Sequence, residues 1–202
     1  MSKSTVMQSY LAACVVVLGF IAYMSFTQPM PTRAPDFQKI ENPNVPTAQP
    51  GPPPTATPVA EGEAFTLMEI PRFGEDWLWT TLEGVSEDVV AKGPGHYPGT
   101  KLPGQEGNVA FAAHRATHGD PFLDFETLEP GDEIRLLQQG ATWVYTVRTE
   151  PEIIESDETW VLDDFAAGRW LTLTTCWPKY GAEKRMYIRA EMTDWNVNEA
   201  GN

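Results

Sequence analysis

Residues 170–176 read Trp-Leu-Thr-Leu-Thr-Thr-Cys, and this run decides the fold of the chain. Leucine and threonine alternate along it, which predicts a β-strand with one apolar face. The strand ends at Cys176, because Trp177 and Pro178 follow and proline does not continue a central strand. We therefore expect the thiol at the rim of a sheet, among loops. The alternative is a buried cysteine that acts as a small hydrophobic residue.

Cys176 has no disulfide partner available to it. The chain has two cysteines, and the other one, Cys14, lies in an apolar N-terminal segment. A lone thiol outside that segment is a candidate nucleophile, since cysteine attacks carbonyl carbon once a neighbouring base removes its proton.

Short strands and turns fill the rest of residues 64–202. Segment 93–100 is rich in glycine and proline and predicts an ordered loop, and segment 122–128 predicts a short helical turn. Strands are expected at residues 65–70, 108–114, 133–137, 142–149, 170–176 and 184–192. Many short strands separated by turns predict an all-β barrel or sandwich.

His114 is the best candidate acid or base among the three histidines. It ends strand 108–114 on a face that carries two alanines, which leaves room for a substrate. His96 lies in the Gly/Pro loop, and His118 precedes a turn glycine. The alternative is that His114 only caps the end of its strand.

Arg185 is the candidate for stabilising a developing negative charge. It follows Cys176 by nine residues, so a neighbouring strand is expected to return it beside the thiol. Its guanidinium is always charged and presents a planar fork of donors to an oxyanion. Arg189 lies on the same strand face and is the competing candidate, and a surface salt bridge is the alternative role.

The N-terminal segment predicts a membrane anchor. Residues 10–26 form an apolar run of 17 residues, at the short end of what crosses a bilayer as a helix. Lys3 favours a cytoplasmic location for residues 1–9, which puts the rest of the chain outside the cell. Two alternatives fit the sequence less well. A cleaved signal peptide would need an A-x-A-like site after the apolar run, and the sequence has none there. The lipoprotein-like box at residues 11–14 precedes the apolar core, whereas a cleavage box would follow it.

Residues 27–63 contain ten prolines in 37 positions and predict a disordered, extended linker. The folded domain is then expected over residues 64–202. The net charge of -14 argues against nucleic acid as a partner, because phosphate contacts need clustered lysine and arginine.

No metal or cofactor is expected from the residue pattern. Cysteine and histidine do not occur at zinc-site spacing. Acidic residues cluster between Glu150 and Asp164, but they lack the spacing of a calcium-binding loop. We interpret this segment as a solvated acidic loop, with Ca²⁺ as the alternative.

Taken together, these residues resemble the sortases, membrane-tethered cysteine transpeptidases of Gram-positive bacteria. Residues 172–176 match the family's TLxTC signature, residues 112–115 (Ala-Ala-His-Arg) match its histidine strand end, and Arg185 stands in the place of its arginine. The chain most resembles class E sortases, on residues 70–74, 84–89, 93–100 and 103–104. It departs from class E at Trp177, directly after Cys176: class E members commonly carry histidine there, followed by proline as in this chain.

The resemblance implies an eight-stranded β-barrel with short helices that cleaves a sorting signal between threonine and glycine. Cys176, His114 and Arg185 would be catalytic, and the segment between Glu150 and Trp170 would wall the peptide groove. Tyr97, Thr175 and His96 would bind substrate, and Tyr97 favours an LAXTG signal ahead of LPXTG.

The implied partners are the sorting-signal peptides of secreted surface proteins and an amine of the peptidoglycan precursor. The implied location is the cell membrane, with a single helix as anchor and the catalytic domain outside. Two alternatives remain: a sortase that polymerises pilins, disfavoured because residues near Asn202 are polar and form no second membrane segment, and a non-catalytic surface β-barrel.

Overall fold

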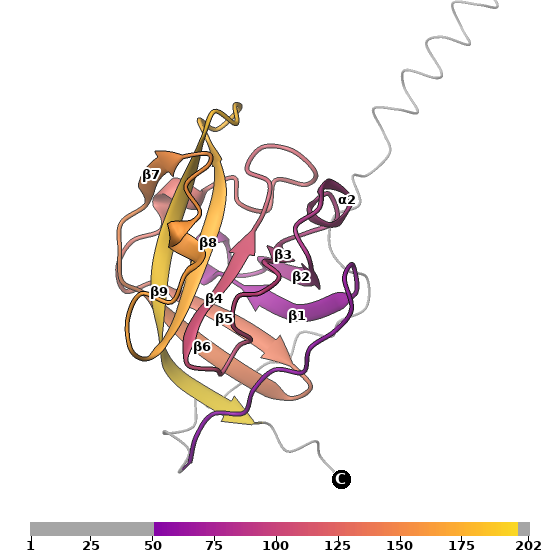
Figure 1. The fold of residues 1–202 in the computed structure, drawn as a ribbon, viewed down its shortest axis with the longest axis vertical. Coiled ribbons are helices and arrows are strands. Elements are labelled where there is room, and N and C mark those ends of the chain that lie inside the picture. Colours follow the sequence, from indigo (N-terminus) through magenta and orange to yellow (C-terminus); the bar gives the residue numbers. More distant parts are fainter. Residues whose placement is uncertain (1–50, 198–202) are drawn as a thin grey trace, which may run out of the picture. The chain divides into compact units, whose positions relative to one another are not determined.

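The computed structural model describes residues 51–197. They form nine strands and four short helical segments (Figure 1). The strands are β1 (Ala64–Glu69), β2 (Leu78–Glu83), β3 (Gly95–His96), β4 (Gly107–Ala112), β5 (Glu133–Gln138), β6 (Ala141–Val147), β7 (Glu152–Glu155), β8 (Arg169–Trp177) and β9 (Lys184–Val197). The helical segments are η1 (Pro71–Phe73), α2 (Glu87–Val90), η2 (Phe125–Thr127) and η3 (Trp160–Leu162).

Eight of these strands close into a barrel, as predicted. Their order is β6-β5-β1-β2-β3-β4-β8-β9, and β9 returns to pair with β6. β9 is 14 residues long, so it pairs with β7 near its start and with β6 from Ala190 to Val197. β7 is thus a ninth strand attached outside the closed ring.

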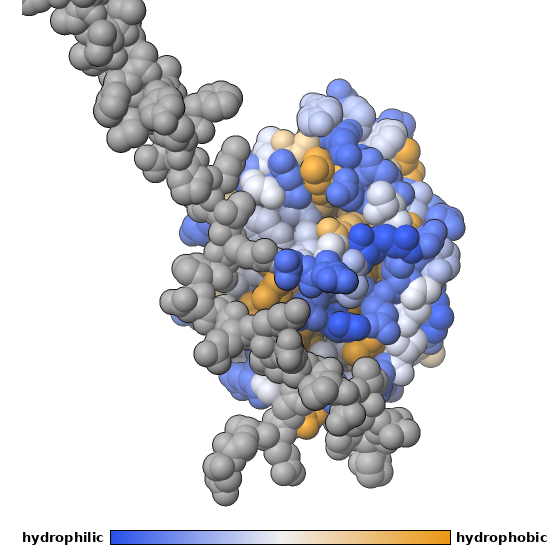
Figure 2. All heavy atoms as spheres, turned by 180° about the vertical axis from the view of Figure 1, so that it is seen from behind, coloured by the Kyte–Doolittle hydropathy of each residue, from blue (hydrophilic) through white to orange (hydrophobic). Residues whose placement is uncertain are grey.

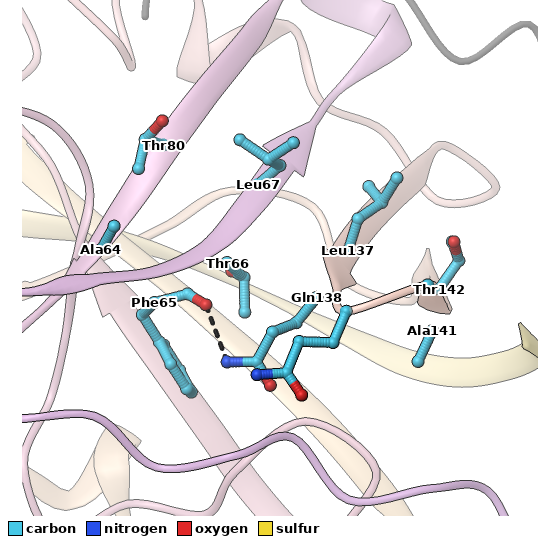
Figure 3. Close-up of a pocket in the computed structure, with 11 residues that line it drawn as sticks. Ala64, Phe65, Thr66, Leu67, Thr80, Leu137, Gln138, Ala141 and Thr142 are labelled. Carbon is cyan, nitrogen blue, oxygen red and sulfur yellow. Dashed lines mark hydrogen bonds between the residues drawn. The ribbon is translucent and has the colours of Figure 1, made fainter. Parts of the chain in front are cut away.

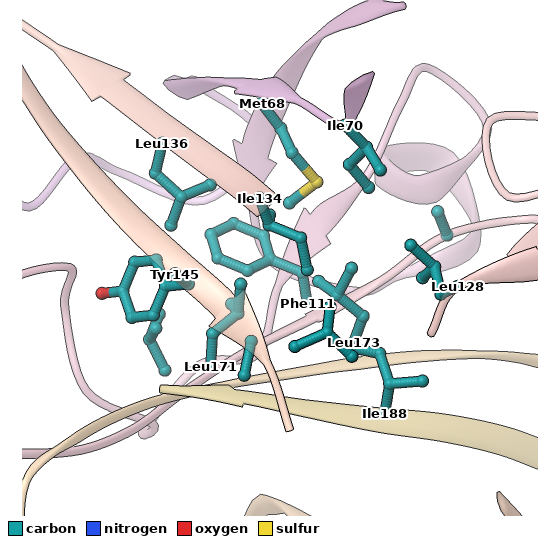
Figure 4. Close-up of a cluster of buried hydrophobic side chains, with 14 of the residues drawn as sticks. Met68, Ile70, Phe111, Leu128, Ile134, Leu136, Tyr145, Leu171, Leu173 and Ile188 are labelled. Atoms are coloured by element: carbon teal, nitrogen blue, oxygen red, sulfur yellow. The ribbon is translucent and has the colours of Figure 1, made fainter. Parts of the chain in front are cut away.

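The apolar faces of the strands fill the barrel (Figure 4). In β8, Leu171 and Leu173 are fully buried, and they meet Phe111 of β4 and Ile188 of β9 in the same cluster. Burying a side chain of this size stabilises the fold by about 1.5–3 kcal/mol. The leucine–threonine alternation of β8 therefore directs the leucines to the core and Thr172 and Thr174 to the opposite face.

The structure contains elements that the sequence pattern did not indicate: β2, α2, β3 and β7. β3 lies inside the Gly/Pro loop and is only two residues long. A Cβ atom on Gly95 would lie 2.2 Å from the carbonyl oxygen of Gly84, so glycine is needed for this close backbone approach.

The packed part of the chain begins before Ala64, the predicted start. The indole of Trp143 donates to the Pro54 carbonyl at 2.8 Å, and the Ala56 amide donates to the Pro103 carbonyl at 2.9 Å. Ala56 is 3% exposed. Proline-rich sequence therefore packs on the barrel here, because its main-chain groups find partners there.

The predicted anchor at residues 10–26 and the first part of the predicted linker lie outside the described residues. Between residues 51 and 197, no helix is long and apolar enough to cross a membrane. From behind the view of Figure 1, hydrophilic residues dominate the surface and hydrophobic ones form small separate areas (Figure 2).

A pocket of about 280 Å³ opens between β1 and the β5–β6 hairpin (Figure 3). Threonine, glutamine and aliphatic side chains line it, and Gln138 donates to the Phe65 carbonyl at its edge. None of its lining residues is titratable or comes from β4, β8 or β9. It therefore offers no group for acid–base chemistry.

Candidate active site

The parallel pairing of β4 with β8 directs the chain at His114 toward the end of β8 that carries Cys176. The two strands pair in one unbroken register over six residues. Beyond the last pair, the Ala113 amide donates to the Thr174 carbonyl at 3.2 Å, and the Thr175 hydroxyl donates to the Ala113 carbonyl at 2.9 Å. Extending the register of the last pair, Ala112 with Thr174, by two residues brings His114 level with Cys176.

The antiparallel hairpin of β8 and β9 brings Arg185 to the same edge. Cys176 and Arg185 are direct Cα partners in this pairing, and such partners lie about 4.5–5.5 Å apart. Nη1 of Arg185 donates to the carbonyls of Ala182 and Lys184, both at 3.0 Å. These bonds hold the guanidinium at the mouth of the β8–β9 loop.

Arg189, the competing candidate, lies elsewhere. It pairs with Thr172, four residues from Cys176 along β8. Its guanidinium carbon lies 3.5 Å from the ring centre of Phe165 and is also close to the rings of Trp160 and Tyr187. Of the two arginines, the register therefore favours Arg185 as the partner of the thiol.

The electrostatic setting of His114 suits a base. Its side chain is 18% exposed, and burial lowers its pKa from the ordinary value of 6.5. A coulombic interaction with His118 lowers this pKa further, while the carboxylate of Glu87 acts in the opposite direction. The imidazole is therefore mainly neutral at neutral pH and has a lone pair to accept a proton. Cys176 is a free, partly exposed thiol.

Two neighbours of His114 were not predicted from the sequence. The His118 ring stacks on His114 with centres 4.4 Å apart and planes inclined by 27°. Oε1 of Glu87, in α2, lies 3.9 Å from Nε2 of His114. The spacing of the two histidines was visible in the sequence, but the stacking depends on a left-handed backbone at His118, with φ of 55°.

A buried arginine lies beneath the catalytic candidates. Arg115 directly follows His114, and its side chain is 1% exposed. Its Nη2 donates to Glu126 at 2.6 Å, and Nη1 reaches the Cys176 carbonyl at 3.5 Å. The guanidinium also lies over the Trp177 ring, 5.0 Å from its centre. Arg115 thus connects the loop after β4 to the end of β8, and Trp177, where the sequence departs from the class E pattern, is one of its contacts.

Tyr97 lies near the candidate site. Its hydroxyl is 3.0 Å from that of Thr174, two residues before Cys176. Residues two apart in a strand share a face, so the phenol lies on the face that carries the thiol. This position is compatible with contact to a peptide bound there.

Two residues expected to bind substrate are instead engaged inside the fold. His96 is 2% exposed, with Nδ1 2.7 Å from Glu83 and Nε2 3.0 Å from the Lys101 carbonyl. Thr175 is 3% exposed, and its hydroxyl is bonded to β4. We therefore correct both assignments: His96 orders the Gly/Pro loop, and Thr175 ties the two strands that present His114 and Cys176.

The acidic segment before β8 covers the sheet next to the site. It was expected to be a loop, but it contains β7 and η3. Val161 of η3 packs against Tyr187 and Ile154 in a small second cluster, while Trp160 and Phe165 remain partly exposed. The Tyr187 hydroxyl donates to Glu152 at 3.0 Å. The segment thus forms a wall with an apolar inner side and acidic residues along it.

Comparisons with known proteins agree with this architecture. The sortase domain model matches residues 68–193. Sortase SrtE1 of Streptomyces coelicolor is 32% identical over 154 residues, which cover 69% of this chain and 43% of that protein. Sortase D of Bacillus subtilis is 31% identical over 117 residues, 58% of this chain and 56% of that protein. The chain thus spans about half the length of these curated relatives.

Solved structures show the same similarity. Sortase E from Streptomyces avermitilis matches with a TM-score of 0.66 and 38% identity, over 71% of this chain and 97% of that one. Sortase E1 from Streptomyces coelicolor, solved with a tripeptide in its active site, matches with a TM-score of 0.64 and 31% identity over the same shares. The domain match, the relatives and the shared barrel together show that this chain belongs to the sortase family.

Proposed function

We propose that this chain is a cysteine transpeptidase that cleaves a sorting signal between threonine and glycine and joins the threonine to an amine. One observation carries the proposal. The registers of β4, β8 and β9 bring His114, Cys176 and Arg185 to one edge of the barrel. A nucleophile, a base and a cation at one point are the groups that acyl transfer requires.

The first half of the reaction forms a thioester. His114 accepts the proton of the Cys176 thiol, and the thiolate attacks the carbonyl carbon of the signal's threonine. Arg185 stabilises the oxyanion of the tetrahedral intermediate. When this intermediate collapses, the carbon–nitrogen bond to glycine breaks, and His114 returns its proton to the leaving amine.

The second half reverses these roles. An acceptor amine attacks the thioester carbonyl, and His114 takes the proton that the amine loses. The carbon–sulfur bond then breaks and the thiolate leaves. The intermediate divides one difficult exchange of amides into two easier steps. We propose that the acceptor is an amine of the peptidoglycan precursor.

We propose LAXTG as the preferred signal, with LPXTG second. The Tyr97 phenol beside Thr174 supports this choice, because it lies near the thiol where it can contact the early positions of the signal. The acidic wall between Glu150 and Asp164 is expected to attract basic residues that flank the motif.

We further propose that residues 10–26 anchor the protein in the cell membrane as a single helix, with residues 1–9 in the cytoplasm and the barrel outside. The proposed partners are then the sorting-signal peptides of secreted surface proteins. This arrangement would keep the enzyme close to substrates that emerge from the membrane.

The test uses the full chain, purified in detergent, with LAXTG and LPXTG peptides and a soluble amine. We expect mass spectrometry to find a thioacyl adduct on Cys176, cleavage after threonine and a product joined to the amine. Cys176→Ala should abolish all three, whereas Cys14→Ala, which removes the other thiol, should leave them unchanged.

A folded protein that forms no adduct with either peptide would contradict the proposed function or its motif. Labelling of Cys176 with a mild electrophile separates these cases. A reactive thiol would indicate a sortase with another signal, and an inert one would favour the non-catalytic surface barrel.

A further inference from the structure

We propose that Glu87, His114 and His118 form a binding site for a divalent transition-metal ion of the zinc type. One ligand atom from each of the three side chains lies within 4.8 Å of those of the other two. Glu87 is the first residue of α2. His114 lies two residues beyond the end of β4, and His118 lies in the loop that follows.

The donor atoms are available for a ligand. Nε2 of His114 is shielded from solvent and has no hydrogen-bond partner among residues 51–197. A buried polar atom without a partner is uncommon in native proteins and asks for an explanation. His118 and Glu87 are exposed, with 80% of the Glu87 side chain open to solvent. The His118 ring must turn out of its stack on His114 to direct a lone pair at the same metal, and its exposed position leaves room for this turn.

The required movement is small. Tetrahedral zinc with bonds of about 2.0–2.1 Å holds its ligand atoms about 3.3 Å apart. The three donors therefore need to close by at most about 1.5 Å from their present spacing. The exposed side chains of Glu87 and His118 can make this movement, while His114 stays in place at the strand end.

The donor set selects the class of metal. Two imidazoles and one carboxylate suit zinc and similar ions, whereas Ca²⁺ and Mg²⁺ prefer oxygen ligands alone. Three protein ligands also leave a fourth position for water or another donor.

The consequence of binding rests on the proposed function. A metal bound to the neutral His114 imidazole occupies its one basic ring lone pair, which would otherwise accept the proton of the thiol. The ion would therefore act as a reversible inhibitor, and its removal by a chelator would restore the base.

The binding test is made in the Cys176→Ala full chain, so that neither the thiol nor turnover contributes. Zn²⁺ is titrated in competition with a fluorescent zinc chelator. We expect one ion per chain, with His118→Phe and Glu87→Gln each weakening binding by at least about tenfold. His118→Phe keeps an aromatic ring on His114, and Glu75→Gln, which removes an exposed charge outside the cluster, serves as the matched control. Unchanged affinity in both cluster variants, or an absence of zinc binding, would overturn the site.

Activity supplies the second measurement. Zn²⁺ should block thioacyl formation by the wild-type protein, and a chelator should reverse the block. His118→Phe should need at least about tenfold more Zn²⁺ for the same inhibition. If the wild-type protein does not cleave peptides without zinc, the proposed function or its motif fails, and the binding titration alone decides the metal site.

Discussion

Replacing Glu126 with alanine tests whether the ion pair beneath the catalytic candidates supports the fold. Arg115 is 1% exposed, and Glu126 is its carboxylate partner at 2.6 Å. Removing one partner of a buried pair costs about 3–5 kcal/mol, because the other charge stays buried. Glu126 is itself 41% exposed, and Arg115 also stacks on Trp177. We therefore expect a loss of about 2–3 kcal/mol, below the fully buried range.

Urea unfolding, followed by tryptophan fluorescence, measures this loss. For a domain of this size, it corresponds to a drop in melting temperature of about 4–12 °C. Glu129→Ala is the matched control, since Glu129 pairs with Arg72 at the surface and is 59% exposed. The control should change stability by less than about 1 kcal/mol. If Glu126→Ala is as stable as this control, the buried pair does not support the fold as we argue.

A double replacement, Arg115→Met with Glu126→Leu, separates the two sources of this cost. If the penalty comes from an uncompensated buried charge, removing both charges should restore most of the stability. Thioacyl formation should be slower in the double variant than in the wild-type protein, because the contact of Arg115 with the Cys176 carbonyl is lost. Recovery of both stability and full rate would show that Arg115 does not position the thiol.

The same pair predicts a dependence on pH. Burial alone would raise the pKa of Glu126, but its own amide, Arg115 and Lys179 donate to the carboxylate and hold the pKa below the ordinary value of 4.5. A lowered pKa in the folded state gives stability that is present above the unfolded pKa and is lost as the pH falls through the folded pKa. The stability difference between wild type and Glu126→Gln should therefore be constant near neutral pH and shrink below about pH 4.5.

Three other changes have defined outcomes. Arg185→Ala should slow thioacyl formation by about 10²–10³-fold, as expected for the loss of an oxyanion donor. A wild-type rate in Arg185→Ala, with a slow rate in Arg189→Ala, would assign the oxyanion role to Arg189. Tyr97→Phe should reduce the preference for LAXTG over LPXTG in a competition read by mass spectrometry, and an unchanged ratio would remove the phenol from signal selection. Trp143→Phe deletes the indole donor to Pro54, so it should cost about 1 kcal/mol of stability and speed hydrogen exchange at the amides of residues 55–57. Unchanged exchange would show that the bond does not hold this segment.

The sequence alone determined the class of fold and supplied the candidates for the reactive residues. Alternating leucine and threonine before Cys176 defines a strand and its apolar face, because side chains along a strand alternate with a period of two. The same local rule placed His114 at a strand end. Arg185 was assigned to the strand face away from the core, and the structure has it there, opposite Cys176.

Only the tertiary structure decided which of these groups meet. The chain between β4 and β8 contains three further strands, so no local pattern specifies that the two pair in parallel and in register. Arg115 and Glu87 acquired their places from contacts between segments distant in the sequence. His96 and Thr175 lost their expected roles for the same reason: whether a polar side chain is free for substrate depends on the partners that packing brings to it.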